Sequence, residues 1–175
     1  KTSWLQFANA LVQGHIVISD LYSNTQVMTG EVAGGIGSSA SILYYNDTVT
    51  YPDNTTEPMD LQILPMPRAA GGKMLASQAG VGLCALKTTA QKQEAISVFA
   101  HWLTDSDRNL AFAAQTGYMP VTYDAFDAIK DYDFNNAAFA SLYQTFTQVQ
   151  QSARILSEPS FAGFYGETGS LYEAL

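Results

Sequence analysis

The chain has 175 residues, of which 47% are hydrophobic and 14% are charged; this composition suits packed globular domains and excludes a disordered or fibrous protein. Its formal net charge of −8 disfavours nucleic acids and anionic membranes as partners, because both are negatively charged. No apolar run approaches the roughly 20 residues that span a bilayer. The first residues, KTSWLQ, carry neither an initiator methionine nor an apolar signal region, so we expect a piece of a longer protein.

Apolar spacing and turn residues predict short elements in the first half of the chain. In chain order these are a helix over the first twelve residues, a short helix between Ser19 and Gly30, a strand at EVAGGIG (31–37), a helix capped by Ser38 or Ser39, a polar loop at 46–58, and a strand at LQILPMP (61–67). The serines suit a helix start because a hydroxyl accepts a hydrogen bond from a free backbone N–H of the first turn.

The second half begins with AGVGLCAL (79–86), an apolar run that predicts a buried strand with Cys84 as a small buried hydrophobe. A helix at 90–104 follows, capped by Thr88 or Thr89. We expect this helix to bury Ile96, Phe99 and Leu103, and Ser106 and Thr122 to cap two more helices. A further helix has an apolar stripe formed by Phe139, Leu142, Tyr143, Phe146 and Val149. We expect the tail from Phe161 to be weakly helical. Strands interleaved with helices predict a helix-rich α/β fold.

The sequence contains no evident catalytic grouping. Neither His15 nor His101 has a triad partner or a metal-ligand spacing beside it, and no G-x-S-x-G elbow occurs. We therefore expect no catalytic residue, no metal and no cofactor.

The segment GGIGSSA offers the alternative of an enzyme. Gly35, Gly37 and Ala40 spell G-x-G-x-x-A between a predicted strand and a predicted helix, and Asp53 or Glu57 lies near the spacing of a ribose-binding acid. On this reading the chain is an α/β enzyme, or a nucleotide-binding domain, that uses the loop for a phosphorylated cofactor.

Three other features have both a structural and a binding interpretation. The serine pair after Gly37 is either a plain helix cap or a site for an anion or polar hydroxyl. Arg154, the only cation after residue 130, either pairs with a nearby acid or forks onto an anionic ligand. Tyr118, after the glycine that ends a helix, is either a core-edge residue or one wall of a ligand site.

Three segments taken in order carry a family resemblance. They are TGEVAGGIGSSASI, LQILPMPRAAGG and AGVGLCALKTTAQKQEAISVFAHWLTDSDRNLAFAAQTGYMPVTYDAF. Together they resemble the extracellular solute-binding proteins of ABC importers, the large sugar-binding class, from about residue 14 onward. Within that class they are most similar to the glycerol-3-phosphate-binding proteins.

The resemblance implies a fold of the type II periplasmic-binding-protein kind, of which this chain is mostly the second lobe. Residues of about 1–78 and 118–175 would form that lobe, and about 79–117 would be a piece returning to the first lobe. The implied partners are a small-molecule solute, either a sugar or a glycerophosphate, and the membrane permease of an ABC importer. We expect a monomer outside the cytoplasm, either periplasmic or a cell-surface lipoprotein.

The same resemblance implies five ligand-binding residues. Ser38 and Ser39 would meet the polar head of the solute, and Gly80 would let backbone N–H groups approach it. Tyr118 would be a wall and hydrogen-bond donor, and Arg154 would neutralise a phosphate. The chain has Ala79-Gly80 where the family has two glycines, and SARILSEP matches only through its arginine and a following apolar position. If Arg154 is structural, a neutral sugar is the better ligand.

Overall fold

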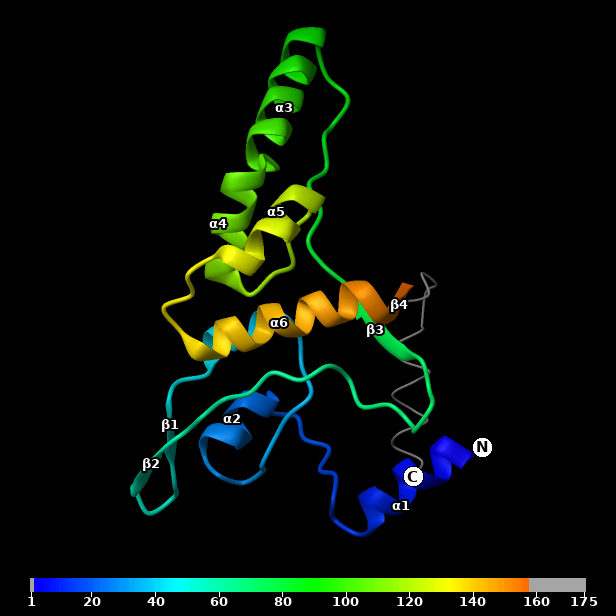
Figure 1. Cartoon of the computed structure of the whole chain (residues 1–175), viewed down its shortest axis with the longest axis vertical. Coiled ribbons are helices and arrows are strands. Elements are labelled where there is room, and N and C mark those ends of the chain that lie inside the picture. Colours follow the sequence, from blue (N-terminus) through cyan, green and yellow to red (C-terminus); the bar gives the residue numbers. More distant parts are fainter. Residues whose placement is uncertain (1, 158–175) are drawn as a thin grey trace.

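The computed structural model describes residues 2–157, and its elements form the helix-rich α/β arrangement that the sequence predicts. Figure 1 shows α6 across the middle, α3 projecting beyond α4 and α5, and the β1–β2 hairpin on the opposite side of α6. The elements are α1 (Thr2–Val12), α2 (Ser23–Met28), η1 (Ser39–Tyr44), β1 (Thr48–Thr50), β2 (Thr56–Pro58), β3 (Met74–Gln78), α3 (Ala90–Leu103), α4 (Ser106–Thr116), α5 (Tyr123–Ala128), η2 (Ile129–Asp131), α6 (Ala137–Ser152) and β4 (Ala153–Ser157).

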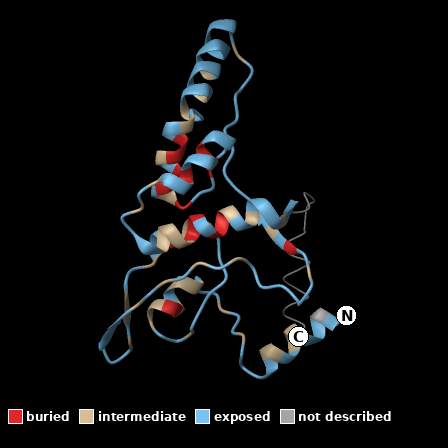
Figure 2. Ribbon diagram, in the orientation of Figure 1, coloured by how far each residue is buried: buried red, intermediate tan, exposed pale blue. Residues whose placement is uncertain are grey.

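The core lies where α6 meets α4, α5 and η1 (Figure 2). The apolar stripe predicted for α6 is confirmed, because Leu142, Tyr143 and Phe146 are all buried on it. The Tyr143 ring stacks on Phe134, with the ring centroids 4.7 Å apart. The buried cluster comprises Ile42, Leu110, Ala125, Phe126, Ile129, Leu142, Tyr143 and Phe146.

Capping side chains set four of the helix starts in the described part of the chain, those of η1, α3, α5 and α6. The hydroxyl of Thr89 accepts a hydrogen bond from the backbone N–H of Lys92, and that of Thr122 accepts from Ala125, so both predicted caps are confirmed. The predicted cap Ser106 is wrong. Asp105 occupies that position and makes no capping bond; its carboxylate lies 3.3 Å from the guanidinium of Arg108 instead.

The strands of the described residues form two small sheets that the sequence did not predict. β1 and β2 pair antiparallel inside the expected polar loop, with Val49 opposite Glu57. β3 pairs parallel with β4, from Met74 opposite Ala153 to Gln78 opposite Ser157. This second pairing joins segments far apart in the sequence, so neither strand could be recognised from its own neighbours.

The strand predicted at 61–67 is wrong. This segment pairs with no strand, and its backbone is hydrogen-bonded to side chains of α6 instead. The hydroxyl of Thr145 donates to the carbonyl oxygen of Ile63 at 2.7 Å. The Ser141 hydroxyl accepts from the Ile63 N–H at 2.9 Å and lies 3.3 Å from its carbonyl oxygen. Side-chain hydroxyls of a helix thus satisfy backbone groups that a ladder would otherwise pair.

The strands predicted at 31–37 and 79–86 are also wrong. Residues 79–86 are exposed and form no ladder with any described residue; Val81 is 89% exposed and Cys84 is exposed rather than buried. Helix α3 has the predicted bounds, but it buries no residue in the described part of the chain, and Phe99 is 51% exposed. The apolar residues of 79–86 and of α3 would be buried only against another surface, and no described residue supplies one.

Candidate functional site

Ser38 caps η1, as the sequence predicts. Its hydroxyl accepts a hydrogen bond from the backbone N–H of Ala40 at 3.4 Å, and its carbonyl oxygen accepts from the hydroxyl of Ser41 at 2.6 Å. Ser38 is exposed and Ser39 is half-buried. A capping hydroxyl keeps its own proton to donate, so Ser38 can cap the helix and still contact a solute.

Gly117 brings the turn that carries Tyr118 against η1. It ends α4 in the left-handed conformation, with φ at 71°, which glycine adopts without a Cβ penalty. A Cβ here would lie 2.6 Å from Cγ2 of Ile42 and 2.8 Å from the carbonyl oxygen of Ser39. Gly117 therefore has a second role beyond the cap, since it lets the two backbones touch. The structure thus places the backbone of Ser39, at the start of η1, against the glycine that precedes Tyr118.

The turn presents its side chains outward from a backbone held on the core side. Tyr118 is 39% exposed and Met119 is 38% exposed. The hydroxyl of Tyr143 lies 3.2 Å from the carbonyl oxygen of Tyr118, and Oδ1 of Asn109 accepts from the N–H of Val121 at 2.8 Å. The result is an exposed aromatic ring and a thioether on a turn whose backbone is hydrogen-bonded at both ends.

Sequence reasoning missed Asn109. It lies inside α4 and is 8% exposed. A signal was available, because asparagine is unfavourable within a helix unless its carboxamide has a partner. The identity of that partner, on the far side of the turn, could not be read from spacing.

Burial makes the phenol of Tyr143 harder to ionise. Its side chain is 1% exposed, and burial raises the pKa of Tyr143 well above its usual value of 10.0, with a smaller contribution from nearby Tyr132. A neutral phenol retains the proton with which it binds carbonyl oxygens.

Gly80 and Arg154 lie apart from the serine pair and Tyr118. Arg154 is on β4, exposed and opposite Leu75, whereas Gly80 follows the end of β3. A Cβ on Gly80 would meet nothing within 4 Å. No carboxylate of the described residues lies within ion-pair distance of Arg154. The two ion pairs of the described residues are Arg108–Asp105 and Lys130–Asp127. Among the described residues, no hydrogen bond or ion pair joins either Gly80 or Arg154 to η1.

The context required for a dinucleotide-binding loop is not found at GGIGSSA. No strand precedes it, and the helix that follows is the six-residue η1. Gly35 instead makes room for Ser23, because a Cβ would lie 2.5 Å from the Cβ of Ser23. The candidate acids serve the β1–β2 hairpin: Asp53 accepts from the N–H and hydroxyl of Thr55, which lowers its pKa, and Glu57 accepts from the hydroxyl of Tyr51.

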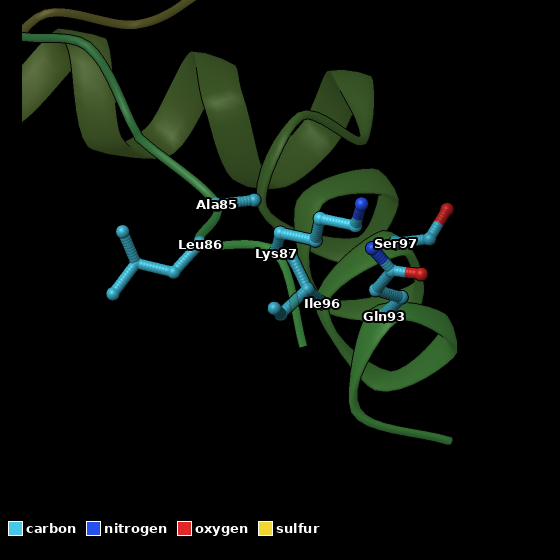
Figure 3. Close-up of a pocket in the computed structure, with 6 residues that line it drawn as sticks. All are labelled: Ala85, Leu86, Lys87, Gln93, Ile96 and Ser97. Atoms are coloured by element: carbon cyan, nitrogen blue, oxygen red, sulfur yellow. The ribbon is translucent and has the colours of Figure 1, made fainter. Parts of the chain in front are cut away.

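Two shallow depressions lie along α3, away from the candidate site. Figure 3 shows the first, between the extended segment at 85–87 and the helix. Neither depression includes any predicted site residue. The first is lined by Ala85, Leu86, Lys87, Gln93, Ile96 and Ser97, and the second by Gln91, Glu94, Ala95, Val98, Phe99 and Trp102.

Residues 2–140 match the family model of the bacterial extracellular solute-binding proteins. The chain belongs to this family. Neither the curated proteins nor the solved structures contain a match to the sequence. Family membership confirms the predicted resemblance to extracellular solute-binding proteins. It supports a role in solute binding for transport and a location outside the cytoplasm.

Two further observations concern this solute-binding protein as far as the structure describes it. Within residues 2–157 no helix has both the length and the apolar character to cross a bilayer. The same residues contain no group of three or more histidine, cysteine, aspartate or glutamate side chains placed to hold a metal ion.

Proposed function

We propose that this solute-binding protein captures a sugar or glycerophosphate-like solute in a cleft between lobes and delivers it to the membrane permease of an ABC importer. The observation that supports the proposal is the close approach at Gly117, which sets the turn that carries Tyr118 against the backbone of Ser39, the second serine of the pair. Serine hydroxyls and a phenol match the hydroxyl groups of a sugar or glycerol, and the ring of Tyr118 offers a flat apolar surface.

A neutral sugar is the solute that this arrangement favours. The serine pair and Tyr118 carry no charge, and Arg154 lies on β4 without a described contact to either. An anionic glycerophosphate would need a cation close by, because a buried phosphate without a partner loses its hydration at a large cost. For the anionic alternative to hold, the solute would have to reach Arg154, which the proposed division puts in the same lobe as the serine pair and Tyr118.

We also propose that residues 79–117 are the piece that returns to the first lobe, with 1–78 and 118–175 in the second. What supports this is the exposure of 79–86 and of α3, whose apolar residues have no cover among the described residues. Helix α4 packs on α5 and η1, so it would lie at the junction between the lobes.

The setting that fits this role is a monomer in the periplasm or a lipoprotein at the cell surface. We propose further that the chain is not an enzyme, because the glycines and acids of the alternative nucleotide site serve local packing and turns. Membership of a family of binding proteins supports the same conclusion.

A thermal-shift panel on the protein at its full natural length tests the proposal. The panel contains maltose, glucose, sn-glycerol 3-phosphate, NAD and ATP. We expect a neutral sugar to raise the melting temperature most. A rise with NAD or ATP alone would overturn the proposal in favour of the enzyme alternative.

Two matched pairs of variants locate the site on any solute that binds. Tyr118→Ala is expected to weaken binding more than Tyr123→Ala, since Tyr123 is also exposed, at 83%, but lies beyond the turn. Arg154→Ala is expected to leave a neutral sugar unaffected, and to weaken a glycerol phosphate by about 2–5 kcal/mol if that anion meets it. Arg68→Ala, at another exposed cation, is the control.

A further inference from the structure

We propose that Tyr143 and Asn109 are positioning residues that hold the backbone of the 117–121 turn, so that Tyr118 is already placed for the solute before binding. This inference rests on the proposed function, because it deepens the role of the same turn. Neither residue faces the solute; each acts through the backbone of the turn.

Asn109 holds the far end of the turn. Its side chain comes from the middle of α4, is 8% exposed, and accepts a hydrogen bond from the N–H of Val121 at 2.8 Å. The bond closes the chain back onto the helix that it has just left. Asn109 is buried, so its carboxamide would be costly to leave without this partner, and the bond fixes where the turn ends.

Tyr143 holds the near end. Its hydroxyl reaches from α6 to two carbonyl oxygens, those of Ala113 and Tyr118. Ala113 belongs to the last turn of α4, and its carbonyl also accepts from the N–H of Gly117 at 3.0 Å. One phenol therefore bridges the end of the helix and the residue that follows the glycine cap, and this fixes the angle between them.

The arrangement separates a fixed backbone from free side chains. Within 118–121 the carbonyl of Tyr118 and the N–H of Val121 are held from the core side, and Pro120 is buried. The side chains of Tyr118 and Met119 stay more than a third exposed. A ring on such a backbone loses little conformational freedom when a solute binds, which favours affinity.

The ring of Tyr143 is fixed independently of its hydroxyl. It stacks on Phe134 at 4.7 Å and meets Phe146 edge-on at 5.3 Å. Tyr143→Phe therefore keeps this packing and removes only the bridge to the turn. Thr145→Val is the matched control, because it removes another buried hydroxyl of α6 whose bond goes to Ile63 and not to the turn.

The experiment compares wild type, Tyr143→Phe, Asn109→Ala and Thr145→Val in the full-length protein. Amide hydrogen exchange of residues 117–121 is measured together with affinity for maltose and for sn-glycerol 3-phosphate. We expect both test variants to speed exchange in the turn by about tenfold, the effect of losing one net hydrogen bond. We expect a loss of affinity of similar size for the probe that wild type binds, with Thr145→Val unchanged in both measurements.

Each outcome decides whether Tyr143 and Asn109 position the turn for binding. Unchanged exchange in Tyr143→Phe and Asn109→Ala would overturn the inference, as would faster exchange with unchanged affinity. Equal losses of affinity in the control would assign the effect to general stability and overturn it as well. If wild type binds neither probe nor any other sugar of the panel, the proposed function fails, and exchange alone then shows whether the two residues hold the turn.

Discussion

Helices α3 and α6 have similar lengths, 14 and 16 residues, and similar starts, yet they end up in opposite surroundings. Each begins at a capping side chain, Thr89 or Asn136, that accepts from the backbone N–H groups of the first turn. Helix α6 buries four residues, whereas α3 buries none in the described part of the chain. Figure 2 shows the contrast as a red centre and a pale projecting arm.

The difference teaches that a helix and its burial have separate causes. Caps and helix-favouring residues form α3 locally, but its apolar face needs a surface to cover it. Helix α6 finds that surface in α4, α5 and η1. The described contacts of α3 are few: Arg108 lies over the ring of Trp102 at 5.0 Å, and the extended segment at 85–87 runs beside the helix. The proposed first lobe would supply the missing surface.

Truncating one phenylalanine in each region gives the largest contrast. Phe126→Ala removes a 4% exposed side chain from the core and is expected to lower the free energy of unfolding by about 3–5 kcal/mol. Phe99→Ala on α3 is expected to cost less than about 1 kcal/mol within this chain, because its side chain is half exposed. Urea unfolding measures both. Equal losses would mean that α3 is packed in solution after all.

Adding a single methyl group tests the contact between the turn and η1. Gly117→Ala is expected to lower stability by roughly 2–4 kcal/mol, since it combines a left-handed backbone with overlap onto Ile42 and Ser39. Gly71→Ala is the control: its φ of 73° is left-handed too, but a Cβ there meets nothing within 4 Å, so about 1–2 kcal/mol is expected. Equal effects in thermal unfolding would remove the contact from the description of the site.

Alkaline pH tests the burial of α6 through Tyr143. The folded state raises the pKa of this phenol above its usual 10.0, so its contribution to stability is complete below pH 10 and is lost as the pH rises further. Between pH 10 and 11.5 wild type should lose up to about 1.4 kcal/mol per pH unit more than Tyr143→Phe does. Parallel pH profiles for the two proteins would show that the phenol is open to water.

Removing one hydroxyl from each helix gives the smallest contrast. Thr145→Val breaks the bond that fastens Ile63 to α6 and is expected to cost about 1 kcal/mol. Thr104→Val, at the end of α3, breaks an exposed bond to its own helix and should change stability by less than about 0.5 kcal/mol. The reverse order in denaturant unfolding would show that the segment at 61–67 is not held by α6.

The parts of the fold that local chemistry determines were predictable. The starts of α3 and α5 follow from the caps Thr89 and Thr122, and the buried face of α6 follows from its apolar spacing. The parallel pairing of β3 with β4 depends on segments almost eighty residues apart, which no local pattern reveals. At 79–86 a strand was predicted where none forms, because an apolar pattern does not by itself supply a neighbouring strand to pair with.

The candidate site also has a part that the sequence predicted and a part that it could not predict. The resemblance named Ser38, Ser39 and Tyr118. Sequence alone could not show that Gly117 sets the turn of Tyr118 against the backbone of Ser39, since a helix cap already explains the glycine. Asn109 was missed because its partner lies across the turn. The ligand-binding roles expected of all five residues stay predictions, and Gly80 and Arg154 lie on or after the β3–β4 pair.

The most direct test of the proposed binding site is backbone amide chemical-shift mapping by NMR while the sugars, sn-glycerol 3-phosphate and the nucleotides are titrated in turn. We predict that one sugar shifts the resonances of residues 37–41 and of 117–119 together, with a single dissociation constant for both segments. Shifts confined to α3, or shifts at residues 35–40 with a nucleotide and none at Tyr118, would contradict a solute site built from η1 and the turn.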